Sequence, residues 1–178
     1  MLHVITFQSA AMVIDFCKED RVYPFNLEET IIASNYSEVA IQCYHYMYEI
    51  YNRTKKTNYD GFFWGFLSDT ISPIGDMSIY ERAADMIDLK DEDLDSTVIM
   101  DLRIPDDLGL ITDFYNWTDL IFCKLEHDMK FISARSFDEI RNDLFDPRVS
   151  EKQVVFPYID RFMISDVYMA RELLERRD

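Results

Sequence analysis

The chain has 178 residues, of which 48% are hydrophobic and 15% aromatic, so it can bury the core of one domain, which argues against general disorder. Its formal net charge of −16 argues against direct binding to nucleic acid or to an anionic membrane, because both need Lys and Arg. The same charge is compatible with solubility alone or with a basic protein partner, including the nucleic-acid channel of another protein.

The three cysteines, Cys17, Cys43 and Cys123, are odd in number and lie far apart in apolar segments. This pattern predicts buried free thiols in a reducing compartment. The first residues lack the basic start of a signal peptide, and no apolar run is long enough to cross a bilayer. We therefore expect a cytoplasmic protein without membrane association.

Hydrophobic periodicity predicts alternating strands and helices in the first half of the chain. The expected elements are a strand at 2–7, a helix capped by Ser9, an extended segment at 22–25, a helix from Ser37 to Lys56, a strand at 62–67, a loop at 72–76 and a helix at 78–87. Residues 27–32 fit either a helical turn or a short strand.

The most strongly patterned stretch lies in the middle, at residues 95–122. Residues 97–104 alternate with a period of two, as in a strand, and Pro105 ends the pattern because it has no N–H. Asp113 is expected to cap a helix that buries Trp117 against this strand. The acidic run at 88–95, which enters the strand, is expected to be exposed and mobile, because such a charge density does not pack in a core.

The last third predicts shorter elements. These are a strand at 130–134, a helix at 136–145 that begins with the capping box Ser136-Phe137-Asp138-Glu139, a strand at 153–159 ending near Pro157, a strand or helix start at 167–170, and a frayed helical end at 171–178. Together the elements predict a single α+β domain over residues 1–178, with a mixed or antiparallel sheet packed against helices.

No motif specifies a metal, a cofactor or a nucleophile. His3, His45 and His127 have no partner at ligand spacing, and the acidic run lacks the glycine and the final Glu of a calcium loop. With four glycines in the chain, a glycine-rich phosphate loop is not expected either. We therefore predict no metal site and no resident cofactor.

Asp101 is the carboxylate with the most informative setting, since it interrupts an apolar strand. It lies two residues before Arg103 and on the same face of the strand. Either the two side chains form an ion pair within the strand, or Asp101 is a site carboxylate at the strand end.

Several segments resemble a family of small bacterial and phage proteins that is known only as a domain of unknown function. They are VITFQS at the start, TVIMDLRIPDDLGLITDFYNWTDLIF in the centre, and SFDEIRNDLF and VVFPYI near the end. The matching positions are Thr6, Gln8, Ile104-Pro105-Asp106, Asp113-Phe114 and Trp117, whereas Ile5 and Phe137 stand where the family has Trp. The resemblance covers under half of the chain and implies a fold but no assigned activity.

The order of elements also resembles, more loosely, a minimal ADP-ribosyltransferase fold, in which split sheets form a cleft for NAD. That resemblance implies that Thr6 and Gln8 face the nucleotide, but the catalytic Glu of such enzymes has no identifiable counterpart here. Fold similarity alone is a weak basis for function.

Two functional hypotheses follow. In the first, the chain is an acidic inhibitor that binds a basic nucleic-acid-binding protein, in the manner of a phage anti-CRISPR protein. The residues expected to bind the partner are acidic and flank the central strand: Asp88, Asp91, Glu92, Asp93, Asp95, Asp106 and Asp107. They form either one negative rim or two groups at opposite ends of the strand. In the second hypothesis, the chain is an ADP-ribosyltransferase-like enzyme that uses NAD and needs a concave pocket.

Overall fold

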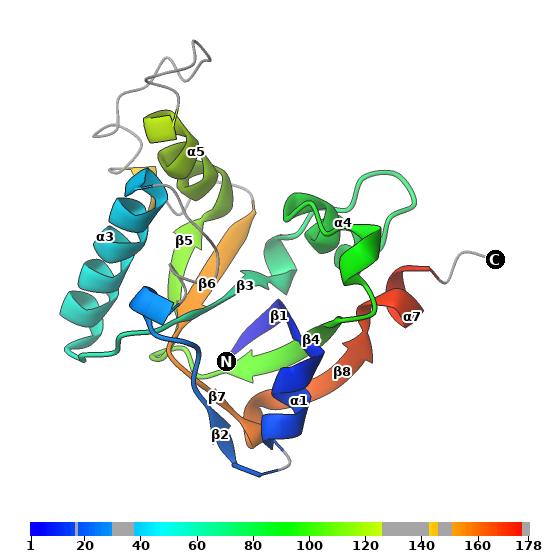
Figure 1. The fold of residues 1–178 in the computed structure, drawn as a ribbon. Helices are drawn as coiled ribbons and strands as arrows, with labels where there is room; N and C mark the ends of the chain where they lie inside the picture. Colours follow the sequence, from blue (N-terminus) through cyan, green and yellow to red (C-terminus); the bar gives the residue numbers. More distant parts are fainter. Residues whose placement is uncertain (17, 30–37, 126–142, 146–150, 176–178) are drawn as a thin grey trace.

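The computed structural model describes residues 1–16, 18–29, 38–125, 143–145 and 151–175 (Figure 1). Its strands are β1 (Leu2–Ser9), β2 (Arg21–Val22), β3 (Phe63–Leu67), β4 (Thr97–Ile104), β5 (Leu110–Asp113), β6 (Lys152–Phe156), β7 (Ile159–Asp160) and β8 (Ile164–Met169). Its α-helices are α1 (Ala10–Phe16), α3 (Glu38–Lys55), α4 (Ile79–Met86), α5 (Phe114–Leu125) and α7 (Ala170–Leu174), and short 3-10 turns are η1 (Ser68–Thr70), η2 (Asp91–Asp93) and η3 (Arg161–Met163).

The predicted α+β class is confirmed. Six strands form one sheet in the order β5-β6-β3-β1-β4-β8, and β2 pairs with β7 in a small second sheet. Every strand pair that the structure describes is antiparallel. Residues 167–170 were expected to form either a strand or a helix start. Both occur, because β8 ends at Met169 and α7 begins at Ala170. The strand expected at 130–134, most of the helix expected at 136–145, Ser37 and Cys17 lie outside the described residues.

Capping side chains begin the helices where the sequence predicts them. Ser9 Oγ accepts a hydrogen bond from Ala11 N at 3.3 Å at the start of α1. Ser78 and Glu81 form a capping box at the start of α4, and Asp113 Oδ1 accepts from Asn116 N at 2.7 Å at the start of α5. Each cap satisfies backbone N–H groups that have no partner within the helix.

The six-stranded sheet is split along its middle. β1 pairs with β4 over its whole length, from Leu2↔Ile104 to Ser9↔Thr97, but it pairs with β3 only at Val4↔Leu67 and Ile5↔Phe66. Beyond Ile5 the ladder between β1 and β3 ends, although each strand continues beside its other neighbour. The sheet therefore has two halves, β5-β6-β3 and β1-β4-β8, which are joined at one end of the β1–β3 pair.

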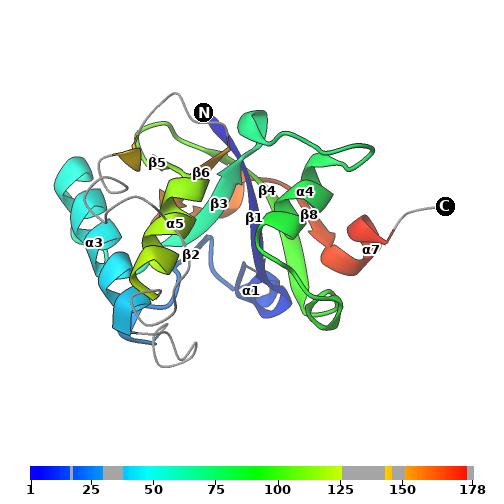
Figure 2. The same ribbon diagram turned by 90° about the horizontal axis from the view of Figure 1, so that it is seen from above.

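Helices cover the two faces of this split sheet differently. On one face α1 and the β2–β7 ribbon pack on a core cluster that spans both halves and includes Val4, Met100 and Val154. On the other face α3 and α5 lie over the β5-β6-β3 half, while α4 and α7 lie over the β1-β4-β8 half (Figure 2). On this face the two helix groups thus leave part of the central strands uncovered.

The alternation predicted for residues 97–104 is confirmed. Val98, Met100 and Leu102 join the core cluster beneath α1, and Ile99 joins the cluster beneath α4 and α7. The expected packing of Trp117 on this strand is wrong. Because α5 lies over the other half of the sheet, Trp117 packs on Trp64 of β3 instead.

Candidate functional site

A pocket of about 580 Å³ opens between α4 and α5, above the central strands that the two helix groups leave uncovered. We call it the aromatic pocket, and its lining consists mainly of apolar and aromatic side chains: Phe7, Tyr44, Trp64, Gly65, Phe66, Met86, Ile87, Phe114, Trp117, Thr118 and Gln153. Its size lies within the range of small-molecule sites. Among the described lining residues none carries a charge.

The wall of the aromatic pocket consists of aromatic rings that contact one another. The Trp64 and Trp117 rings stack with centroids 4.8 Å apart and planes 25° apart, and Tyr44 meets the edges of both, at 5.7 and 5.5 Å. Trp64 and Trp117 are the two tryptophans of the chain. Stacked rings of this kind present a flat surface on which a planar ligand can pack.

Gln153 contributes the polar group of the aromatic pocket. It lies on β6 opposite Phe66 of β3 and Thr112 of β5, and its side chain is 5% exposed. Its Nε2 is buried and has no hydrogen-bond partner in the structure. A buried donor without a partner destabilises a protein by roughly 1–3 kcal/mol, so this amide is suited to a ligand that brings an acceptor.

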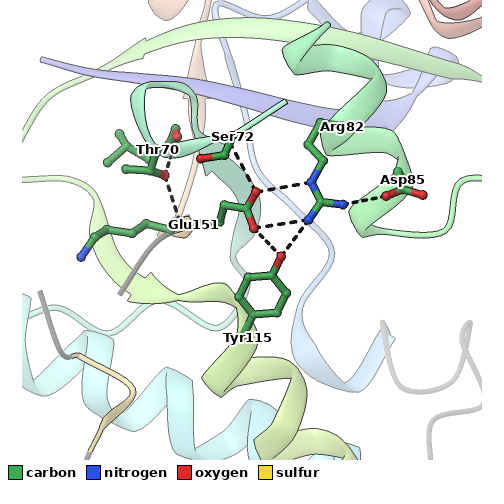
Figure 3. Close-up of polar contacts among 8 residues, drawn as sticks. Thr70, Ser72, Arg82, Asp85, Tyr115 and Glu151 are labelled. Carbon is green, nitrogen blue, oxygen red and sulfur yellow. Dashed lines mark hydrogen bonds and ion pairs between the residues drawn. The ribbon is translucent and has the colours of Figure 1, made fainter. Parts of the chain in front are cut away.

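A polar network links α4 to α5 (Figure 3). The Glu151 carboxylate accepts hydrogen bonds from the Tyr115 hydroxyl, from Arg82 Nε and Nη2 at 3.4 and 3.5 Å, and from Ser72 N at 3.4 Å. Arg82 Nη2 also donates to Tyr115 Oη at 2.8 Å, and its Nη1 donates to Asp85 at 2.7 Å. We call these three side chains, Glu151, Arg82 and Tyr115, the Glu151 network. The network connects α4 and α5 to the residue that precedes β6.

The Glu151 network keeps its carboxylate ionised. Burial alone raises the pKa of Glu151, but the hydrogen bonds from Tyr115, Arg82 and Ser72 outweigh burial and lower it. The hydrogen bond to Glu151, followed by burial, raises the pKa of the Tyr115 hydroxyl. Tyr115 thus remains a neutral donor, and the network has the properties of a structural tie.

A second pocket, of about 490 Å³, lies where β1 and β3 separate, and we call it the split pocket. It shares Phe7 and Trp64 with the aromatic pocket. Its lining includes Phe7, Gln8, Ser9, Ala11, Met12, Asp15, Val22, Tyr23, Pro24, Phe25, Phe62, Phe63 and Trp64. The split of the sheet therefore creates two adjoining cavities.

Of the two residues expected to face NAD, one reaches a pocket. Gln8 is partly exposed and lines the split pocket. Thr6 is fully buried, and its Oγ1 donates to Trp64 O at 2.6 Å while accepting from Gln8 Nε2 at 2.7 Å. Thr6 therefore links the two halves of the sheet and offers no surface to a ligand.

The acidic run at 88–95 is exposed at its carboxylates, as expected, but part of it is ordered as the η2 turn. Leu94 is buried and anchors the turn. Arg171 of α7 donates to Asp95 at 2.5 and 3.1 Å and to Asp91 O at 3.1 Å, and its hydrogen bond lowers the pKa of Asp95. Lys90 pairs with Asp88. Asp91, Glu92 and Asp93 carry the remaining exposed carboxylates of the run.

Asp106 and Asp107 lie at the opposite end of β4 from this run. The amino group of Met1 pairs with Asp106 at 2.9 Å, and Lys55 Nζ donates to the main-chain carbonyl of Asp107 at 2.7 Å. Of the two arrangements that the sequence leaves open, the structure has two acidic groups at opposite ends of the strand.

Asp101 is buried and contacts neighbouring elements. Tyr80 of α4 donates to Asp101 Oδ2 at 2.7 Å, and His3 Nε2 lies 3.8 Å from Oδ1. No ion pair between Asp101 and Arg103 occurs among the described side chains, so the pairing expected within the strand is replaced by contacts to α4 and β1.

No sequence motif marks Gln153, Glu151, Arg82 or Tyr115 as functional residues. Gln153 could have been noticed as a polar residue within the apolar strand QVVFPYI. Within the described ranges, no three His, Cys, Asp or Glu side chains gather as a metal site, and no helix is long and apolar enough to cross a membrane. Cys43 is buried.

Comparison with known protein families, with curated proteins and with solved structures finds no match to this chain. The two resemblances suggested by the sequence therefore gain no support from these comparisons, and the function must be inferred from the geometry.

Proposed function

We propose that this chain binds a small, uncharged, aromatic ligand in the aromatic pocket. The proposal is carried by Gln153, whose buried Nε2 has no partner and lines a pocket built on two stacked indole rings. A planar ring would pack on the aromatic wall, and a carbonyl or ring nitrogen on it would accept the Gln153 hydrogen bond. The uncharged lining disfavours a charged ligand, because nothing there compensates its desolvation.

The test uses intrinsic fluorescence, since both tryptophans of the chain line this pocket. We expect benzamide, which has a ring and a carbonyl acceptor, to quench the emission and to bind at least tenfold more tightly than toluene, which lacks the acceptor. Gln153→Met should remove this preference. Equal binding of benzamide and toluene to the unmodified chain would overturn the proposal.

Thr112→Val is the matched control. Thr112 lies directly opposite Gln153, and its Oγ1 is also buried without a partner, but it does not line the aromatic pocket. The preference for benzamide should therefore persist in Thr112→Val. NAD in the same titration addresses the transferase hypothesis, which requires NAD to bind more tightly than nicotinamide.

A second candidate function is the acidic inhibitor of a basic protein. The observation that favours it is the η2 turn, which holds Asp91, Glu92 and Asp93 in one exposed turn of a chain whose net charge is −16. Capture of a partner from lysate should then weaken steeply between low and high salt. Replacing Asp91, Glu92, Asp93 and Asp95 by the corresponding amides should slow association. Binding that is unaffected by salt and by this quadruple substitution would contradict the electrostatic mechanism.

A further inference from the structure

The mouth of the split pocket carries aromatic side chains that are unusually exposed. Phe25 is 73% exposed and Tyr23 is 54% exposed, and both line the pocket. Deeper in the same pocket, Phe62 and Phe63 are buried. Large apolar groups exposed at the rim of a cavity are typical of surfaces that another molecule covers.

The same pocket is also lined by a carboxylate, that of Asp15. Asp15 lies on α1, and its side chain is 57% exposed. Among the described residues Asp15 pairs with Lys18, whose Nζ lies 4.0 Å from the carboxylate. The Lys18 side chain is 69% exposed, so this pair is weak in water. No Lys or Arg occurs among the described residues that line the pocket. Among the described lining residues Asp15 is therefore the one charged group, and Arg21, which contacts Tyr23, is already paired with Asp160.

Aromatic rings together with a carboxylate form the usual environment for an organic cation, because ring faces attract positive charge and the carboxylate supplies an ion pair. A guanidinium group matches this environment best, since it stacks on rings and is weakly hydrated. The volume of about 490 Å³ is ample for one long side chain.

We propose that the split pocket binds an arginine side chain of a basic partner protein. The charge of the whole chain selects the occupant, since a molecule of net charge −16 attracts basic proteins and repels acidic ones. The pocket then supplies the anchor, with Asp15 pairing to the guanidinium and Phe25 and Tyr23 covering its stem and plane. This inference rests on the second candidate function and adds a specific contact to it.

The experiment follows binding of a short blocked peptide, acetyl-Gly-Arg-Gly-amide, by the fluorescence of Trp64. The Trp117→Phe variant serves as the background, because Trp64 is then the remaining tryptophan and lines the split pocket. The control ligand carries citrulline in place of arginine, which keeps the shape but removes the charge. We expect at least tenfold weaker binding of the citrulline peptide.

Two protein variants locate the contact. Asp15→Asn and Phe25→Ala should each weaken the arginine peptide at least fivefold. Glu19→Gln is the matched control, because it removes the same charge from an exposed residue close to Asp15 that does not line the pocket. It should leave peptide binding unchanged.

Three results would overturn the proposal. They are equal binding of the arginine and citrulline peptides, equal effects of Asp15→Asn and Glu19→Gln, and ethylguanidinium binding as tightly as the peptide, which would indicate a site for a free small cation. Failure of the inhibitor proposal is separable, because the quadruple substitution in the acidic run leaves the split pocket intact. If the peptide still binds while no partner shows salt dependence, the inhibitor proposal alone fails.

Discussion

Two buried polar residues near the start of β6, Glu151 and Gln153, differ in the partners they have. Their exposed fractions are almost the same, 4% and 5%. Glu151 receives hydrogen bonds from Tyr115, Arg82 and Ser72, whereas Gln153 Nε2 has no partner. The first belongs to a network that links α4 and α5, and the second lines the aromatic pocket. Burial alone therefore does not indicate a binding site. The missing partner of Gln153 does so because its amide also lines a pocket, which the equally unpartnered Thr112 hydroxyl does not.

The largest effect on stability should come from a change in the aromatic wall of the pocket. Trp117 is 5% exposed and packs on Trp64 and Tyr44. Trp117→Ala should lower the free energy of unfolding by about 3–5 kcal/mol, because it leaves a large cavity between α5 and β3. Urea denaturation measures this, with Trp117→Phe as the milder control. An unchanged midpoint would mean that the stack is not part of the core.

Breaking the Glu151 network should lower the free energy of unfolding somewhat less. Glu151→Gln should lower the free energy of unfolding by about 3 kcal/mol, because it leaves the Arg82 charge with a weaker partner in a buried setting. Asp85→Asn, at the exposed side of the same network, is the control and should have a much smaller effect.

The same variant should change the dependence of stability on pH. The pKa of Glu151 is lower in the folded chain than the 4.5 of an unperturbed Glu. Its stabilising contribution is therefore fully present above pH 4.5 and is lost as the pH falls through the folded value. The stability difference between the unmodified chain and Glu151→Gln should thus shrink below pH 4.5. A difference that stays constant down to pH 2 would contradict an ionised Glu151.

Removing the unpartnered amide of Gln153 should instead stabilise the chain. Gln153→Met should raise the free energy of unfolding by about 1 kcal/mol in the absence of ligand, because a buried donor without a partner is replaced by an apolar group. Thr112→Val should act similarly. Urea denaturation of both variants measures this, and a loss of stability in Gln153→Met would contradict an unpartnered amide.

The smallest effect on stability is expected from the exposed acidic turn. The quadruple substitution of Asp91, Glu92, Asp93 and Asp95 should leave the melting temperature within measurement error, since these carboxylates face solvent. Within the part of the chain that the structure describes, it removes the ion pair of Asp95 with Arg171. A clear drop in melting temperature would show that this pair helps to hold α7.

The elements that the sequence predicts best are those with local signals. The period-two pattern at 97–104, the Ser9 cap and the Asp113 cap each depend on a few neighbouring residues, and the structure contains all three. The sheet order is different, because it depends on pairings such as Leu2↔Ile104 that no local pattern encodes. For this reason the sequence placed Trp117 on the wrong strand.

The candidate site was less predictable for the same reason. Glu151, Arg82 and Tyr115 come from three separate segments and carry no motif, so only the folded chain brings them together. Thr6 was expected to face NAD on the strength of a fold resemblance, but it is buried and its hydroxyl links β1 to β3. The acidic residues were evident from composition, yet composition cannot show that Arg171 and Met1 pair with some of them.

The split of the sheet has a consequence for how the chain folds. The chain passes from β1 to β3, back to β4, on to β5 and β6, and back to β8, so each half is assembled from segments that are distant in sequence. The register pair Ser9↔Thr97 alone closes a loop of nearly the first hundred residues. Folding should therefore be slow compared with a helical bundle of this size, because such loops must close before their contacts form. Limited proteolysis between β3 and β6 should likewise release no stable half, since a cut there leaves both halves with strands from either side of it.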